Sequence, residues 1–270
     1  RELPVLAVRG YVSLEQKVGE VTVEAWHRLT DAAAGKKALE HAAKAVELLE
    51  ARLGPLPYAT LRVVETRLEA GAGGMEFPGL VTVSSLLYQG AHSPLAALAL
   101  GDTDAAGLDA LLGTLGPAVG QLFESTLEFT IDHELAHQYF ALLVGSDPVQ
   151  EPVADEALAQ HVALLLLEWR HGARAAKELE DAQLRAAYQL HRLLGGPDAA
   201  ANRPTWAFDS TVEYAALVYG KAPFKFRAWR QVLGDDAWLA ALKAYVHAYR
   251  YRWATARSLL EVASQQVPPA

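Results

Sequence analysis

The spacing of hydrophobic positions changes along the chain, from a strand-like pattern in the first third to a helical pattern afterwards. Short runs rich in valine and aromatic residues predict strands over residues 3–12, 19–27, 61–67 and 80–84. Between the second and third strands, apolar residues recur at helical spacing. We expect Asp31 to cap a helix that runs to about Leu53, where the Gly-Pro-Leu-Pro sequence ends it.

The helical pattern begins at about Leu95 and continues almost to the end of the chain. A loop and a short helix are expected within residues 90–117, which are rich in glycine, and a long helix is expected over residues 119–144. A turn at 145–148 precedes a helix from Val153 to His171. Further helices are predicted over about 174–194, 210–221, 223–233, 235–250 and 254–264.

A sheet-forming region followed by a helical region is an α+β layout. We therefore expect a mixed subdomain over residues 1–118, with a small mixed sheet, and a helical subdomain over residues 119–270. The sequence contains no internal repeat and no low-complexity linker.

Composition narrows the class of protein further. The chain of 270 residues is 51% hydrophobic, enough for a substantial core, and it has no cysteine, which excludes disulfides, thiolate metal ligands and a cysteine nucleophile. No apolar run is long enough for a transmembrane helix. The net charge of −8 argues against nucleic acid as a partner. The chain begins at Arg1 without a signal-peptide pattern, so we expect a piece of a longer protein flanked by further domains; its compartment stays open.

The sequence His-Glu-Leu-Ala-His at 133–137 is an H-E-x-x-H motif, and 18 residues separate His137 from Glu156. On a helix, His133 and His137 lie one turn apart on one face, so both imidazoles can reach one metal ion. Zn²⁺ accepts nitrogen and carboxylate ligands, and Glu156 would be the third. Glu134 would act as general base toward the water that the metal activates. The motif predicts a zinc hydrolase, with peptides as the favoured substrates; the alternative is an amphipathic helix with two surface histidines.

Asp155 precedes the third expected ligand directly. Histidines that bind a metal usually donate their other N–H to a carboxylate or a carbonyl oxygen. We therefore expect Asp155 to orient one of the two ligand histidines.

Several motifs together resemble a known family. They are Gly-Gly-Met-Glu at 73–76, His-Glu-Leu-Ala-His-Gln-Tyr-Phe at 133–140, Asp-Glu at 155–156 and Val-Tyr-Gly-Lys-Ala at 218–222. Their order and spacing resemble the catalytic domain of the aminopeptidase N-type gluzincins, which include the alanyl and puromycin-sensitive aminopeptidases. The resemblance implies a thermolysin-like metallopeptidase fold, one zinc ion per chain, and the removal of N-terminal residues from peptide or protein substrates.

The resemblance also implies roles for individual residues. Gly73, Gly74, Met75 and Glu76 stand in the place of the family's Gly-Ala-Met-Glu-Asn exopeptidase motif, where the glutamate binds the substrate's α-ammonium group. The two glycines would let substrate backbone approach closely and pair with this segment as an added strand. Tyr219 occupies the position of the family's catalytic tyrosine, which donates its hydroxyl to the developing oxyanion. The alternatives are a glycine-rich hairpin with an exposed glutamate and a tyrosine packed in a helical core.

The sequence departs from the family at two positions: Phe77 and Asp155 each stand where the family has asparagine. Three functions stay open at this point. One is a zinc aminopeptidase, another is a zinc endopeptidase or dedicated processing protease, and the third is a binding module that retains its metal without turnover. Assays on free-amine and blocked peptides separate the first two, and bound metal without turnover would indicate the third.

Overall fold

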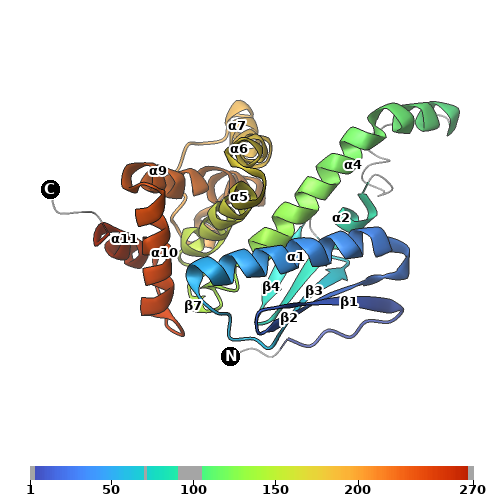
Figure 1. The fold of residues 1–270 in the computed structure, drawn as a ribbon. Helices are drawn as coiled ribbons and strands as arrows, with labels where there is room; N and C mark the ends of the chain where they lie inside the picture. Colours follow the sequence, from blue (N-terminus) through green and yellow to red (C-terminus); the bar gives the residue numbers. More distant parts are fainter. Residues whose placement is uncertain (1–3, 70–71, 91–104, 267–270) are drawn as a thin grey trace. The chain divides into compact units, whose positions relative to one another are not determined.

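The computed structural model describes residues 4–69, 72–90 and 105–266 (Figure 1). The fold combines one five-stranded sheet with many helices, which fits the predicted α+β layout. The chain forms two compact units: Arg1–Glu47 with Pro57–Leu135, and Leu48–Leu56 with Ala136–Ala270. The subdomain boundary expected at residue 118 falls inside a helix.

The first unit contains the five-stranded sheet, in the order β1-β2-β3-β5-β4. Strands β2, β3 and β5 are parallel, while β1 and β4 pair antiparallel at the two ends. The strands are β1 (Tyr11–Val18), β2 (Val21–Arg28), β3 (Thr60–Thr66), β4 (Gly74–Phe77) and β5 (Leu80–Ser84). The strands predicted over 61–67 and 80–84 are confirmed.

The prediction for the first strand is wrong in position, because β1 begins at Tyr11 and not at residue 3. A two-residue turn at Gly19 and Glu20 joins β1 to β2, and Val18 pairs with Val21. Gly19 has a φ of +53°, which a tight hairpin turn requires. In this register Tyr11 pairs with Arg28, the last residue of β2, so the described residues before Tyr11 have no partner in that strand. Residues 1–3 lie outside the described part of the chain.

Helix α1 (Ala32–Leu53) connects β2 to β3, and Figure 1 shows it along the sheet. It begins directly after Asp31, which lies in a single 3₁₀ turn, and it ends at Leu53 as predicted. Alternate residues of β2 are buried, as expected for a strand with one face in the core. Gly35 of α1 lies against the ring of His27, where a Cβ atom would come within 2.0 Å of it. The absence of a side chain at Gly35 therefore lets helix and sheet approach closely.

Strand β4 was predicted only through the alternative of a glycine-rich hairpin, which the structure contains. It pairs antiparallel with β5, from Gly74 opposite Val83 to Phe77 opposite Leu80, and a turn at Pro78 and Gly79 connects the two. The short helix α2 (Ser85–Gln89) follows β5. The predicted loop and short helix within 90–117 lie partly outside the described residues; from residue 105 onward this stretch is helical.

Helix α4 (Ala105–Ala136) ends eight residues before the predicted end at Val144, so that prediction is wrong. The following residues form two very short parallel strands, β6 (Phe140–Ala141) and β7 (Val144–Gly145). The backbone N–H of Gly145 donates to the carbonyl of Arg252 at 2.8 Å. Pairing with a distant segment thus outweighs the helical pattern of this apolar stretch.

The second unit is helical, and its predicted helices are confirmed with small shifts at their ends. Three segments are π-helices: η3 (Val153–Ala157), η4 (Glu180–Arg185) and η6 (Ala215–Lys221). The α-helices are α5 (Leu158–His171), α6 (Ala173–Leu179), α7 (Ala186–Leu193), α8 (Thr211–Tyr214), α9 (Pro223–Leu233), α10 (Asp235–Tyr249) and α11 (Ala256–Ser264). Helix α5 packs against α6 and α9, and η3 packs against η6.

Within the described ranges, no helix combines the length and the apolar character that crossing a membrane would need.

Candidate metal centre

The last turn of α4 carries the first part of the H-E-x-x-H motif. His133 and Glu134 are buried in this turn, and His137 follows it directly and is 1% exposed. The helix continues without a break from Leu135, the last residue of the first unit, to Ala136 in the second. His133 thus lies in the last helical turn and His137 just beyond it, and a ring nitrogen of each lies within 4.8 Å of the other.

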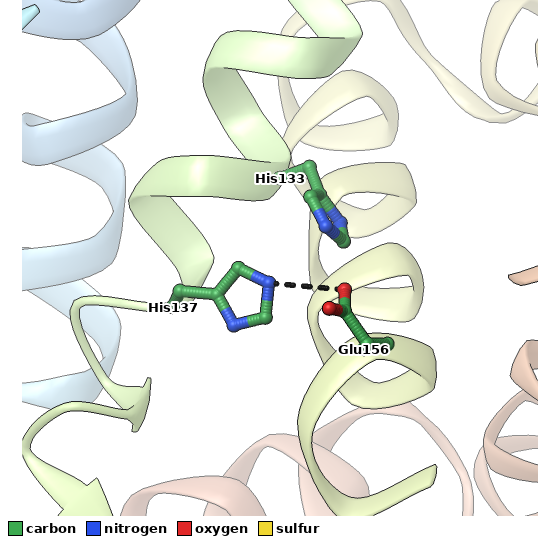
Figure 2. A group of neighbouring side chains, drawn as sticks. All are labelled: His133, His137 and Glu156. Carbon is green, nitrogen blue, oxygen red and sulfur yellow. Dashed lines mark ion pairs between the residues drawn. The ribbon is translucent and has the colours of Figure 1, made fainter. Parts of the chain in front are cut away.

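Glu156 lies in the π-helix η3 and its carboxylate reaches His137. Its Oε2 atom is 3.4 Å from His137 Nε2. One ligand atom from each of His133, His137 and Glu156 lies within 4.8 Å of the others. Figure 2 shows both imidazole rings turned toward the carboxylate of Glu156. These three residues could hold a metal ion.

The separation of two of the ligand atoms is compatible with a shared metal ion such as zinc. Tetrahedral zinc binds histidine nitrogen and carboxylate oxygen at about 2.0–2.2 Å, so two of its ligand atoms are about 3.4 Å apart. The separation of His137 Nε2 and Glu156 Oε2 is 3.4 Å. Two nitrogens and one carboxylate also leave the fourth position open, as catalytic zinc sites do.

Two acceptors lie behind His137. The Nδ1 atom is 3.0 Å from Asp155 Oδ1 and 3.1 Å from the carbonyl oxygen of Phe140. Asp155 is itself buried. Because both neighbours of Nδ1 are acceptors, the ring proton belongs on Nδ1, and Nε2 is left to face Glu156 and a metal ion. The hydrogen bond of Nδ1 is to Phe140, while Asp155 lies at an ion-pair distance, so the orienting role of Asp155 stays a prediction.

The surroundings of His137 favour positive charge. Burial lowers the pKa of its imidazole, but the adjacent carboxylates of Asp155 and Glu156 outweigh burial, and its pKa stands well above the usual value. The same carboxylates would stabilise a divalent cation, which takes the place of the proton when it binds.

Strand β4 lies against the helix face that carries Glu134, within the first unit. A Cβ atom added to Gly74 would come within 2.3 Å of Glu134 Oε1, whereas one added to Gly73 would lie 3.5 Å from Thr130, an ordinary contact. Glu134 is 4% exposed. The glycine at position 74 therefore leaves the room that the Glu134 carboxylate occupies.

The other predicted site residues lie on two further elements. Met75 and Glu76 are in β4, which is the end strand of the described sheet, and Met75 is 44% exposed. Tyr219 lies in η6 and is partly exposed, with its ring 5.8 Å from that of Tyr214, edge to face. Because η6 packs against η3, Tyr219 and Glu156 belong to neighbouring segments of the second unit.

Two features of this site were not predicted from the sequence. One is the carbonyl of Phe140, a backbone acceptor that no residue type reveals. The other is the contact of Gly74 with Glu134, for which the paired glycines at 73 and 74 were the only available signal.

The sequence matches no protein-family model, and it matches none of the curated proteins. A family and a reaction therefore have to be argued from the residues and their geometry.

Proposed function

We propose that this protein is a zinc-dependent peptide hydrolase with the fold of a thermolysin-like catalytic domain, and that it removes N-terminal residues in the manner of the aminopeptidase N-type gluzincins. One observation carries the proposal. His133, His137 and Glu156 offer two nitrogens and one carboxylate within 4.8 Å of one another, and the buried carboxylate of Glu134 lies beside the first of them in the chain.

When bound, zinc supplies a Lewis acid that polarises the scissile carbonyl and makes water acidic enough to attack at neutral pH. Glu134 accepts a proton from the attacking water and delivers it to the leaving amine. Its carboxylate is held by burial in α4 and has little room to move, because β4 passes directly over it at Gly74. Asp155 acts through His137, whose ring it orients.

Tyr219 is the proposed donor to the carbonyl oxygen of the substrate as negative charge develops there. Its partial exposure leaves the ring accessible, and its segment η6 adjoins η3, which carries Glu156. Removing one such donor typically costs about 2.7–4 kcal/mol of transition-state stabilisation.

We propose that strand β4 makes the enzyme selective for the N-terminal residue of a peptide. As the end strand of the described sheet, β4 has one edge without a neighbouring strand, and an extended substrate can pair with such an edge. Glu76 on this strand would bind the substrate's ammonium group by charge-assisted hydrogen bonds.

The test of hydrolysis is the substitution Glu134→Gln. Glutamine keeps the shape of the side chain but cannot accept the proton, so kcat should fall by about 10²–10⁴-fold with the zinc content unchanged. Glu124→Gln is the matched control, because Glu124 lies on the same helix and pairs with Lys37; it should keep full activity. Wild-type-like turnover by the Glu134 variant, within about threefold, would assign the base to another group.

The test of N-terminal selectivity is Glu76→Ala, assayed on matched free-amine and N-acetylated peptides. Loss of the carboxylate leaves the substrate ammonium unpaired, at a cost of about 2–5 kcal/mol. We expect kcat/KM to fall by at least about 30-fold on the free peptide and to change little on the acetylated one. Equal losses on both peptides would make Glu76 structural and would favour the endopeptidase alternative.

A further inference from the structure

The second unit contains a cavity of about 240 Å³ that none of the proposed hydrolytic residues lines. It lies among α5, α6, η4, α9 and the start of α10. Its charged and polar lining residues are His161, Glu168, Lys177, Glu180, Arg227, Arg230, Gln231 and Asp235. Leu164, Leu165, Ala173 and Ala176 supply an apolar wall.

His161 lines this cavity with an unused donor. The ring is 3% exposed, and its Nε2 atom accepts a hydrogen bond from Trp238 Nε1–H at 3.0 Å. Because the indole nitrogen is only a donor, Nε2 must be unprotonated, and the proton of the neutral ring is on Nδ1. No hydrogen bond joins Nδ1–H to another described residue, and Nδ1 is not among the fully buried polar atoms that lack a partner. This donor is therefore accessible from the cavity and can give a hydrogen bond to a ligand.

Two guanidinium groups add further donors near this ring. Both Arg227 and Arg230 act on His161 electrostatically and help to lower its pKa to about 3, although burial is the larger cause. Arg230 donates from Nη1 and Nη2 to Glu168, each at 2.6 Å, and from Nε to Asp235. Arg227 donates from Nη1 to Glu180. A guanidinium has five N–H donors, so these bonds leave two available on Arg230 and four on Arg227.

We propose that this cavity binds a small molecule with a carboxylate group, which accepts hydrogen bonds from His161 Nδ1–H and from the guanidinium groups of Arg227 and Arg230. The apolar wall at Leu164, Leu165 and Ala176 would contact a short aliphatic chain. Two kinds of ligand share this chemistry. One is a free α-amino acid, whose ammonium group would donate a hydrogen bond to Glu168 or Glu180. The other is a carboxylate without an amine. The inference concerns binding only and does not depend on the proposed hydrolysis.

Isothermal titration calorimetry on the full chain tests the proposal with three probes of equal carbon skeleton. L-Leucine has both charged groups, 4-methylpentanoate has only the carboxylate, and L-leucinamide has only the ammonium. We expect a Kd below about 1 mM for at least one of the two carboxylates, and binding of the amide at least about tenfold weaker. The ratio between leucine and 4-methylpentanoate distinguishes the two kinds of ligand. In a parallel titration, the ¹⁵N resonance of His161 Nδ1 should shift with the same Kd.

Matched variants locate the binding. Ala176→Leu fills the cavity without removing a charge and should weaken carboxylate binding by at least about tenfold. Ala175→Leu, at the neighbouring position of α6 that does not line the cavity, should stay within about twofold of wild type. Arg227→Gln removes a donor and should also weaken carboxylate binding by about tenfold. If this variant fails to fold, the comparison of Ala176→Leu with Ala175→Leu decides. Binding that is undetectable at 10 mM, equal for the amide, or unchanged in Ala176→Leu would overturn the proposal.

Discussion

Two buried histidines of the second unit have pKa values shifted in opposite directions. His137 lies between the carboxylates of Asp155 and Glu156, which outweigh burial and raise its pKa. His161 has no such carboxylate among the groups that shift it; burial and the guanidinium groups of Arg230 and Arg227 lower its pKa to about 3. Burial alone favours the neutral ring in both cases. The charges of the neighbouring groups therefore decide which histidine has surroundings that stabilise positive charge.

The low pKa of His161 predicts how stability depends on pH. In the unfolded chain the pKa is about 6.5, so the unfolded state takes up a proton below that pH while the folded state does not until about pH 3. Stability from this group is therefore complete above pH 6.5 and falls as pH decreases toward 3. The carboxylates of Glu168 and Glu180, which line the same cavity, are already paired with Arg230 and Arg227.

We predict that the free energy of unfolding falls by about 2 kcal/mol more in wild type than in His161→Gln between pH 7.5 and pH 5.0. Glutamine keeps an acceptor for Trp238 but does not titrate in this range. Urea denaturation of both proteins at the two pH values measures the difference. Parallel pH profiles would mean that His161 is protonated in the folded protein as readily as in the unfolded one.

At the scale of elements, the packing of β4 on α4 is the contact that bears most directly on the proposed chemistry. Gly74→Ala would place a methyl group 2.3 Å from Glu134 Oε1, so the carboxylate has to move. A shift of about 1 Å in a catalytic group can cost about 10²-fold in rate. We therefore predict a fall in kcat of about that size, with zinc retained. The Tm should fall as well, because the added methyl group would also lie 2.6 Å from Glu134 Cγ and Cδ, so more than the end of this buried side chain has to move.

Gly73→Ala is the matched control for this prediction. Its added methyl group would lie 3.5 Å from Thr130, an ordinary contact, so kcat should stay within about twofold of wild type. Equal effects of the two substitutions on kcat would show that a side chain in this part of β4 lowers activity whether or not it contacts Glu134. Measuring kcat, zinc content and Tm for both variants separates these outcomes.

The helices of the second unit were predictable because each carries its own periodic pattern. Elements that depend on distant partners were not. Phe140 and Val144 read as helical, yet they pair as short strands, and the chain beyond them bonds to Arg252. Strand β4 is only four residues long and takes its conformation from β5. In the same way, the motif at 133–137 and the later Glu156 could be proposed as ligands from spacing alone, whereas the support from Phe140 and the contact with Gly74 required the tertiary structure.

At the scale of the whole molecule, the two compact units do not follow one another along the chain. The end of α1, with the turn after it (Leu48–Leu56), belongs to the second unit, although the rest of that helix belongs to the first. The buried hydroxyl of Tyr139 donates to the carbonyl of Gly54 at 2.6 Å. The guanidinium of Arg52 lies 4.1 Å from the centre of the Trp169 ring.

This arrangement predicts that a fragment of residues 136–270 will not fold as an independent domain. It would lack Leu49 and Leu53, which are buried, and would leave Tyr139 without its acceptor. Circular dichroism should show no cooperative thermal transition for the fragment alone. Adding a peptide of residues 45–58 should restore part of the ellipticity. A cooperative transition of the lone fragment near the Tm of the full chain would contradict the prediction.

The π-helical turn that carries Glu156 restricts how the length of this segment can change in evolution. A π-helix contains one more residue per hydrogen-bonded turn than an α-helix, so deleting one residue from Val153–Ala157 would let the segment close into α-helix. The residues before the deletion would then be rotated by about 100° relative to α5. A deletion after Glu156 would turn its side chain away from His137, whereas a deletion before Glu156 would rotate only the residues that precede it and leave Glu156 in register with α5. The segment η4 (Glu180–Arg185) is also a π-helix but carries no expected ligand, so the same deletion there would leave the three ligands unchanged. Among related chains, a deletion at Ala157 should therefore be absent, whereas a deletion in η4 should be acceptable.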